Sequence, residues 1–157
     1  MKHMAVLWFL LVSLAVAPAL AQSQPSAEQR QAILAYKLTK PLADKLLAAL
    51  PEMTRYVIGK PNFKEIVARS ANQSLNERIA QTEADPGAMA ILKKHGLTAR
   101  EYLIGVPALR MSIMRAQSGD APGSDALIAS ADNLAFAKAN LAELKPKLDA
   151  ADGMARP

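Results

Sequence analysis

The sequence contains no cysteine among its 157 residues. This absence excludes disulfide bonds, thiol redox chemistry and metal sites with thiolate ligands, and it removes the residue that a lipoprotein anchor would modify. Small exported domains often depend on disulfides when they cannot build a sufficient core. If this protein is exported, its stability must therefore come from packing.

Aromatic residues are also scarce, at 4% of the sequence, and the only tryptophan is Trp8. The excess of basic residues is mild, with a formal net charge of +5, and Lys and Arg are spread along the chain. Proteins that bind nucleic acid usually combine a clustered basic face with aromatic side chains that stack on bases. We therefore expect no nucleic-acid partner and interpret the basic residues as part of a solvated surface.

Residues that commonly carry catalysis, metal binding or phosphate binding are few. Beyond residue 21 the one histidine is His95, just before Gly96 at the end of an expected helix, where a polar side chain can pair with free carbonyl groups. The glycines form no phosphate-binding loop, and no G-x-S-x-G motif is present. Asp120 and Asp125 flank a Pro-Gly turn and lack the alternating oxygen ligands of a calcium loop. We expect no metal, no cofactor and no enzymatic activity.

The one long apolar run lies at the start of the sequence. Residues 1–21 read MKHMAVLWFLLVSLAVAPALA, with 17 of 21 positions apolar and a small-x-small exit at Ala19-Leu20-Ala21. This pattern is typical of a secretory signal peptide. The run falls short of the ~20 residues that a spanning helix needs. We predict cleavage after Ala21, a periplasmic or secreted location, no integral membrane segment after cleavage and a single helical domain over residues 22–157.

The 136 residues that follow this segment favour helices. They hold 26 Ala and 16 Leu against 8 Ile, 3 Val and 4 Thr, so helix formers greatly outnumber strand formers. The fold class is therefore all-α, a compact irregular bundle of about five to six helices with proline kinks. Capping residues and helix breakers predict six helices. The first runs from after Ser26 to about Leu38, and the second runs from Thr39 to Val57, where Pro51 should kink or split it. The others are expected over residues 62–84, 85–95 and 99–117 and after Ser130, and the last should fray near Pro146.

The segment 99–117 is the most hydrophobic element of residues 22–157, and we expect it at the centre of the bundle. At 100° per residue, Tyr102 and Ile113 share one face, whereas Ile104 and Met111 lie on the far side. A helix that is apolar nearly all round is buried nearly all round. Pro107 should bend this helix.

Five residues are candidate ligand contacts. Arg110 lies on the expected central helix, so its guanidinium must find a carboxylate or reach a cleft. Tyr102 should face the core, with a hydroxyl bonded to a neighbouring helix rather than a catalytic role. Met111 and Met114 would line an adaptable pocket or fill gaps in the core. Phe136 lies off the apolar stripe of the last helix and either packs or contacts a partner.

Two short motifs carry a resemblance. The sequences LKKHGLTAREY at residues 92–102 and NLAFAK at residues 133–138 resemble those of a set of small exported all-helical bacterial proteins of unknown function. The resemblance covers about the last 70 residues. It implies a periplasmic helical domain and assigns no catalytic residue.

Three functions remain open from the sequence. The first is a non-enzymatic binding or protein-interaction module, because no nucleophile–base, metal or cofactor constellation is present. The second is a carrier of a small apolar or anionic ligand, held between kinked helices near Arg110, Tyr102 and Met114. The third is an enzyme without a recognisable motif, which would need Arg110, Tyr102, His95 and an acid to converge. The sequence leaves the identity of any partner and the oligomeric state open.

Overall fold

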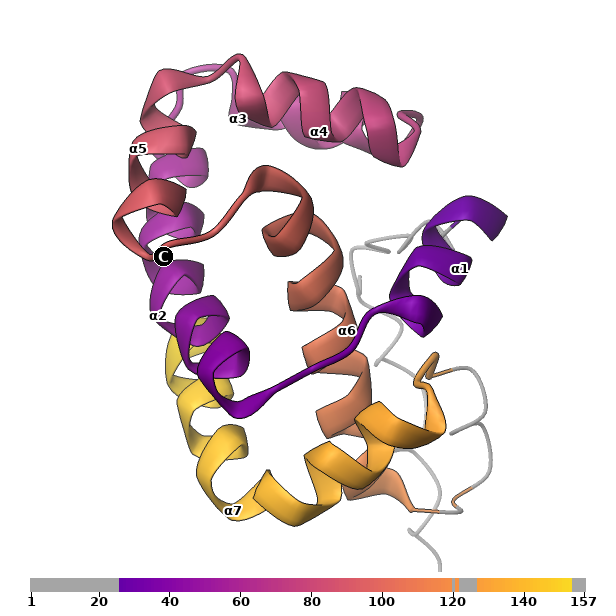
Figure 1. The fold of residues 1–157 in the computed structure, drawn as a ribbon. Helices are drawn as coiled ribbons and strands as arrows, with labels where there is room; N and C mark the ends of the chain where they lie inside the picture. Colours follow the sequence, from indigo (N-terminus) through magenta and orange to yellow (C-terminus); the bar gives the residue numbers. More distant parts are fainter. Residues whose placement is uncertain (1–25, 120, 122–126, 154–157) are drawn as a thin grey trace, which may run out of the picture.

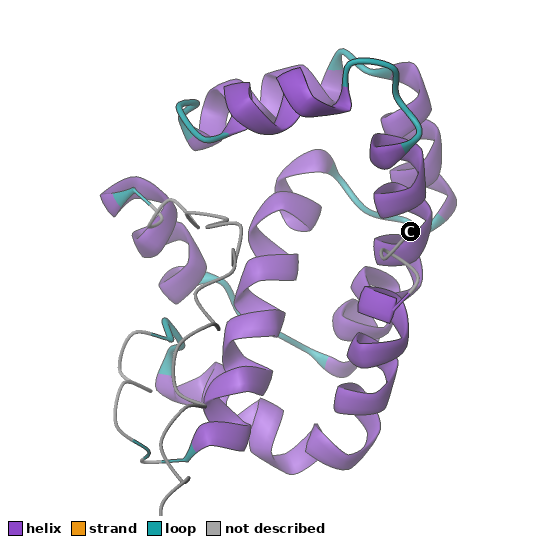
Figure 2. Ribbon diagram, turned by 180° about the vertical axis from the view of Figure 1, so that it is seen from behind, coloured by secondary structure: helices purple, strands orange, loops and turns teal. Residues whose placement is uncertain are grey.

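The computed structural model describes residues 26–119, 121 and 127–153. In these ranges the chain forms seven helices and no strand, which confirms the all-α prediction and exceeds the expected five to six helices (Figures 1 and 2). The helices are α1 (Ala27–Ala35), α2 (Lys40–Ile58), α3 (Phe63–Ser70), α4 (Leu75–Glu83), α5 (Pro86–Lys94), α6 (Ala99–Ser118) and α7 (Ala131–Gly153). The predicted signal peptide, its cleavage point and the predicted turn at Asp120 and Asp125 lie outside the described residues.

Most helix starts follow from their capping residues. Ser26, Ser74 and Thr98 each accept a hydrogen bond from the backbone N–H three residues on, and the side chain of that third residue bonds back to the cap. Asp85 accepts hydrogen bonds from two backbone N–H groups at the start of α5. These caps fix the starts of α1, α4, α5 and α6. The capping boxes expected at Ser26 and Thr98 are confirmed.

The single helix expected over residues 62–84 is in fact two helices. Ser74 begins α4, and Glu77 Oε2 accepts hydrogen bonds from the Ser74 N at 2.7 Å and from the Ser74 Oγ at 2.8 Å. The expectation was wrong because the four-residue repeat of apolar side chains obscured this capping box. The expected apolar face is divided as a result, since Leu75 is 3% exposed and Val67 is 48% exposed.

The helix α6 lies at the centre of the fold, as predicted. It contacts α1, α2, α4, α5 and α7, and both ribbon views show it running through the middle (Figures 1 and 2). Tyr102, Ile104 and Ile113 are buried, although they come from opposite faces of the helix. Burial is incomplete on the remaining side, where Met111 is only partly buried and Met114 is 45% exposed. The expectation of burial nearly all round is therefore wrong for this side.

A glycine allows close approach between α6, α2 and the α1–α2 connection. A Cβ added at the buried Gly105 would lie 2.8 Å from Leu46 Cδ1 and 3.1 Å from Tyr36 Cε1, so the site has no room for a larger residue. The Tyr36 hydroxyl also donates to the backbone oxygen of Glu101 at 3.4 Å. Burial, with a smaller contribution from the charge of Glu101, raises the pKa of Tyr36 to about 12. These contacts anchor the α1–α2 connection on α6.

A buried asparagine joins the same connection to α7. Asn133 is 1% exposed. Its Oδ1 accepts a hydrogen bond from the Leu38 N at 2.9 Å, and its Nδ2 donates to the Tyr36 oxygen at 2.6 Å. One side-chain amide thus pairs with two backbone groups of the extended segment that leads from α1 into α2. This pairing helps to fix the position of α1 relative to the rest of the bundle.

Prolines inside the helices do not end them. The helix α2 continues past Pro51 and α6 continues past Pro107, so the split considered at Pro51 does not occur. The helix α7 continues for a further seven residues past Pro146, to Gly153, which contradicts the expected fraying. Leu148 and Ala151 are 5% and 3% exposed, and the burial of these residues beyond the proline offsets the missing backbone hydrogen bond.

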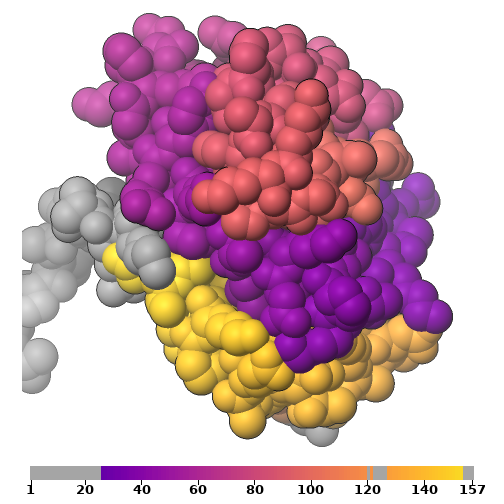
Figure 3. All heavy atoms as spheres, turned by 60° about the vertical axis from the view of Figure 1, so that its left-hand side comes forward, coloured from indigo at the N-terminus to yellow at the C-terminus, as the bar shows by residue number. Residues whose placement is uncertain are grey.

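On one face of the molecule, α2 lies between α5 and α7 (Figure 3). Ion pairs connect these neighbours, with the Lys40 Nζ 2.7 Å from Glu143 Oε1 and the Lys94 Nζ 2.8 Å from Glu52 Oε1. Lys40, Glu143 and Lys94 are more than a third exposed, so water and salt screen these pairs. The helices are therefore held together by their apolar contacts more than by these charges.

Replacing Asp85 by alanine should lower the free energy of unfolding by about 1 kcal/mol at pH 7, because Asp85 caps α5. Asp85 also accepts a hydrogen bond from the Tyr56 hydroxyl at 2.5 Å and pairs with Lys60. Desolvation acts to raise the pKa of Asp85, but the hydrogen bonds from Lys60, Tyr56 and the backbone of Ala88 outweigh it and hold that pKa below its usual value. Urea unfolding of the two proteins measures the difference.

The pH dependence of this difference follows from the direction of the pKa shift. A carboxyl group with a lowered pKa stabilises the fold above its unfolded pKa, which is near ~4, and that contribution is lost as the pH falls through the folded pKa. The difference in the free energy of unfolding between wild type and Asp85→Ala should therefore be largest at pH 7 and become smaller below about pH 4. Asp85→Asn, which keeps a capping oxygen without the charge, should lie between them. A gap that is absent at pH 7, or unchanged in acid, would contradict this role.

Candidate functional site

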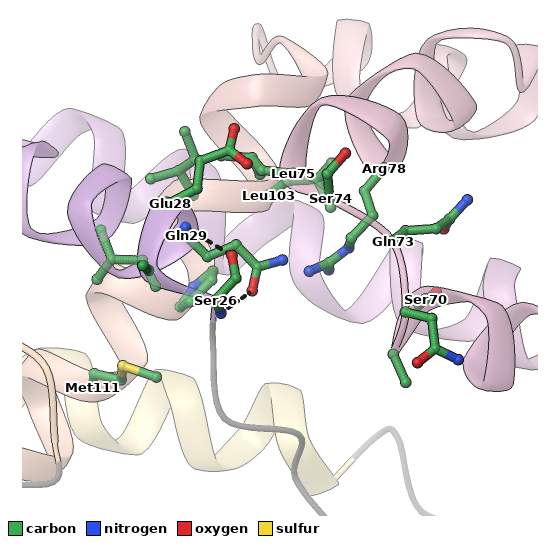
Figure 4. A pocket seen from close by; sticks show the side chains of 16 residues that line it. Ser26, Glu28, Gln29, Ser70, Gln73, Ser74, Leu75, Arg78, Leu103 and Met111 are labelled. Carbon is green, nitrogen blue, oxygen red and sulfur yellow. Dashed lines mark hydrogen bonds between the residues drawn. The ribbon is translucent and has the colours of Figure 1, made fainter.

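A cavity of about 590 Å³ lies between the start of α1, the α3–α4 turn with α4, and the uncovered side of α6 (Figure 4). This volume falls within the roughly 300–1,000 Å³ that is usual for small-molecule sites. Three segments far apart in the sequence build it. Its apolar wall consists of Ile33 from α1, Leu75 from α4, and Leu103, Ile104, Pro107 and Met111 from α6.

The cavity is a consequence of how α6 is covered. The helix α3 ends at Ser70, and Ser74 caps the start of α4, whose first residue, Leu75, is buried at 3% exposure. The α3–α4 turn and the first turn of α1 then lie on either side of Leu103 and Met111, which stay only partly buried. The partly buried apolar side of α6 therefore faces the cavity.

Four of the polar side chains on the cavity wall, those of Ser26, Gln29, Ser70 and Ser74, are already paired. The Ser26 Oγ accepts from the Gln29 N and the Gln29 Oε1 accepts from the Ser26 N, both at 3.2 Å. Ser70 and Ser74 form hydrogen bonds within their own helices. Among the buried side-chain atoms of the described ranges, the Gln73 Oε1 on this wall has no hydrogen-bond partner. A donor on a bound ligand or a water molecule would satisfy it.

Arg78 is the basic residue on this wall. Its partly buried side chain extends from α4 across the cavity towards Ser26 and Gln29 at the start of α1 (Figure 4). Burial lowers the pKa of the Arg78 guanidinium, which still stays protonated at neutral pH. In the part of the chain that the structure describes, no carboxylate lies within ion-pair distance of this guanidinium. The acidic wall residue Glu28 is exposed and lies apart from it (Figure 4).

A second cavity of about 190 Å³ adjoins the first. The two share Ser70, Arg78 and Leu103, so Arg78 lies where they meet. Tyr102 lines the smaller cavity and is 9% exposed. Burial raises the pKa of Tyr102 to about 12, against the opposing charge of Arg110. The smaller cavity extends the space available beside the Arg78 side chain.

The five candidate contacts from the sequence are not brought together. Met111 lines the larger cavity and Tyr102 lines the smaller one. The Arg110 guanidinium forms an ion pair at 2.7 Å with a carboxylate of α7. Of the two expected positions, pairing with a carboxylate is therefore confirmed. Met114 is 45% exposed and lines neither cavity, and Phe136 packs against the core.

His95 also lies away from these cavities. It ends α5, as predicted, and its Nε2 is 3.2 Å from the Glu52 Oε1 on α2. The partner of Arg110 is Asp152 on α7. Two of the side chains that an enzymatic site would have to combine, Arg110 and His95, are therefore paired with acids on different helices.

Arg78 and most of the apolar wall were not predicted from the sequence. The signal that could have found Arg78 is its spacing, because it follows Leu75 by three residues and so lies near the same helix face, whether residues 62–84 form one helix or two. That face packs towards α6, and this packing places Arg78 on the cavity wall.

The described ranges contain neither a metal-binding cluster nor a membrane-spanning helix. No group of three or more His, Cys, Asp and Glu side chains is arranged there to hold a metal ion. Among the helices of the same ranges, none combines the length and the apolar character that crossing a membrane requires. The cavities are therefore the features from which a function can be argued.

Comparisons of the chain with protein families, with curated proteins and with solved structures find no match. The resemblance to small exported helical bacterial proteins stays a prediction.

Proposed function

We propose that the protein is a non-enzymatic binding protein that holds a small, largely apolar ligand between α1, α4 and α6. The observation that carries this proposal is the cavity of about 590 Å³ with apolar side chains from three helices. A ligand in this partly open cavity gains affinity from the apolar area that is removed from water. Export directed by residues 1–21 is part of the proposal, which puts the protein in the periplasm or outside the cell.

A protein-interaction module is the other binding function that the sequence suggested. Within the described residues the exposed large apolar side chains are Leu34, Ile58, Val67 and Met114, and they come from four different helices. Protein interfaces usually use a contiguous apolar patch, whereas single exposed apolar residues are common on any surface. The cavity is therefore the better-supported binding site.

Binding is also favoured over catalysis. The cavity wall, as far as the structure describes it, has no histidine, and its serine side chains all form hydrogen bonds within their own capping boxes or helices. Covalent and acid–base catalysis need a nucleophile and a base within hydrogen-bond reach of each other. Arg110 and His95 have partners on α7 and α2 instead.

Filling the cavity should abolish binding. In Met111→Trp the larger indole occupies space beside Leu103 and Pro107, and we expect the affinity for a neutral apolar probe, N-phenyl-1-naphthylamine, to fall by about tenfold or more. The increase in probe fluorescence on binding measures this affinity. The new tryptophan should also be quenched or shifted when a ligand displaces water near it.

Met114→Trp is the matched control, because it makes the same substitution on the same helix at a residue that is 45% exposed and outside the cavity. We expect this variant to bind the probe as the wild type does. If the wild type does not bind the probe, or if both variants bind it equally well, the proposed function is wrong.

A further inference from the structure

We propose that the cavity selects amphiphiles with a monoanionic carboxylate head, and that Arg78 binds this head while the apolar tail lies along Leu103 and Met111. This inference rests on the proposed function and adds the chemical class of the ligand. The cavity combines an apolar wall with the Arg78 guanidinium, which has no ion-pair partner within the described residues. A fatty acid or another long-chain acid has the complementary distribution of apolar surface and charge.

The state of Arg78 supports an anionic partner. A partly buried guanidinium that lacks an acid is unfavourable, because it has lost part of its hydration without gaining an ion pair. Six basic residues elsewhere in the described bundle do have acidic partners, namely Lys40, Lys60, Lys94, Arg110, Lys145 and Lys147. The sequence of residues 1–25, which precedes Ser26 in the chain, contains no Asp or Glu. A ligand carboxylate would supply the missing charge.

The geometry favours a carboxylate over a phosphate. One guanidinium forms two parallel hydrogen bonds with a carboxylate and balances one negative charge. The other charged side chain on the wall of the larger cavity is acidic, Glu28, and on the wall of the smaller cavity Lys60 is already paired with Asp85. A second negative charge on the head group would therefore be left without compensation. The hydroxyl groups of Ser26, Ser70 and Ser74 are engaged within their own helices and are not arranged as additional phosphate ligands.

The position of Arg78 also defines where the tail lies. Arg78 lies where the larger and the smaller cavities meet, and its side chain points towards the start of α1 (Figure 4). From this point the apolar surface of α6 extends through Leu103 and Pro107 to Met111, at spacings of four residues that place them on one face. A head group at Arg78 therefore has an apolar path for its tail beside it.

The experiment compares dodecanoate with dodecanol as competitors of the neutral probe N-phenyl-1-naphthylamine. The two compounds have the same tail and differ in the charged head. We expect the wild type to bind dodecanoate about tenfold or more tightly than dodecanol. In Arg78→Met this preference should disappear through weaker dodecanoate binding, whereas affinities for dodecanol and the probe should change little. Arg78→Lys should recover part of the preference.

Arg69→Met is the matched control, because it removes the same charge from an exposed residue of α3 outside both cavities. It should keep the full preference for dodecanoate. Equal affinities of the wild type for dodecanoate and dodecanol would overturn this inference without any need for a folded variant. In that case probe binding that Met111→Trp abolishes would leave the proposed function intact, whereas no probe binding by the wild type would overturn both.

Discussion

Asn133→Ala is expected to lower the free energy of unfolding by about 2–4 kcal/mol. The substitution removes the hydrogen bonds that the side-chain amide makes with the Leu38 N–H at 2.9 Å and the Tyr36 oxygen at 2.6 Å. Asn133 is 1% exposed, so water cannot easily replace the amide. Each buried backbone group left without a partner contributes about 1–3 kcal/mol to the loss.

Urea unfolding followed by circular dichroism measures this loss. Asn140→Ala is the matched control on the same helix, because the Asn140 side chain donates within α7, to the Phe136 oxygen at 2.8 Å, and has no other partner in the described part of the chain. We expect it to change the stability by less than about 0.5 kcal/mol. Because the Asn133 amide holds the segment between α1 and α2, Asn133→Ala should also speed amide hydrogen exchange in α1. A stability equal to that of the wild type would contradict the assigned role of Asn133.

Ile113→Ala is expected to destabilise the protein by about 2–5 kcal/mol, because Ile113 is fully buried on α6. Truncation removes apolar contacts and leaves a cavity that the surrounding helices fill only in part. The same unfolding measurement reports the effect. This substitution tests whether α6 is the central element of the core.

The control for Ile113→Ala is its sequence neighbour. Met114 is 45% exposed, so Met114→Ala should change the stability by no more than about 0.5 kcal/mol. Similar effects at the two positions would mean that α6 is not oriented as the structure has it. A large loss at Ile113 alone fits a helix with its most apolar side in the core.

The fold class was predictable because local signals and composition agreed. Alanine and leucine predominate beyond residue 21, and the boxes at Ser26 and Thr98 fix where α1 and α6 begin. The position of α6 at the centre followed from its apolar character on several faces. These features depend on neighbouring residues, which the sequence displays directly.

The errors came from features that depend on tertiary contacts or on competing signals. The repeat of apolar residues over 62–84 favoured one helix, but the Ser74 capping box divides it. Pro146 was expected to fray α7, but burial of Leu148 and Ala151 keeps the helix intact. In both cases an interaction outside the local pattern decides the structure, the Ser74 capping box in the first and the burial of Leu148 and Ala151 in the second.

The candidate site was the least predictable part. Arg110 was singled out because it lies on an apolar helix, yet Asp152 pairs with it. Arg78 was not predicted as a site residue because its neighbours in the sequence are mostly polar. Only the packing of α1 and α4 around α6 places it on the cavity wall. Whether an arginine has a partner depends on residues distant in the chain, so this property could not be obtained from its neighbours.

The central claim is that the cavity between α1, α4 and α6 binds an apolar ligand with an acidic head. Titration of the ¹⁵N-labelled protein with dodecanoate, followed through its backbone amide NMR signals, tests this claim most directly. The account predicts that the largest shift changes occur at cavity residues such as Ile33, Arg78, Leu103 and Met111, with small changes around Lys147 on α7. Saturating changes concentrated elsewhere, or no changes at all, would contradict it.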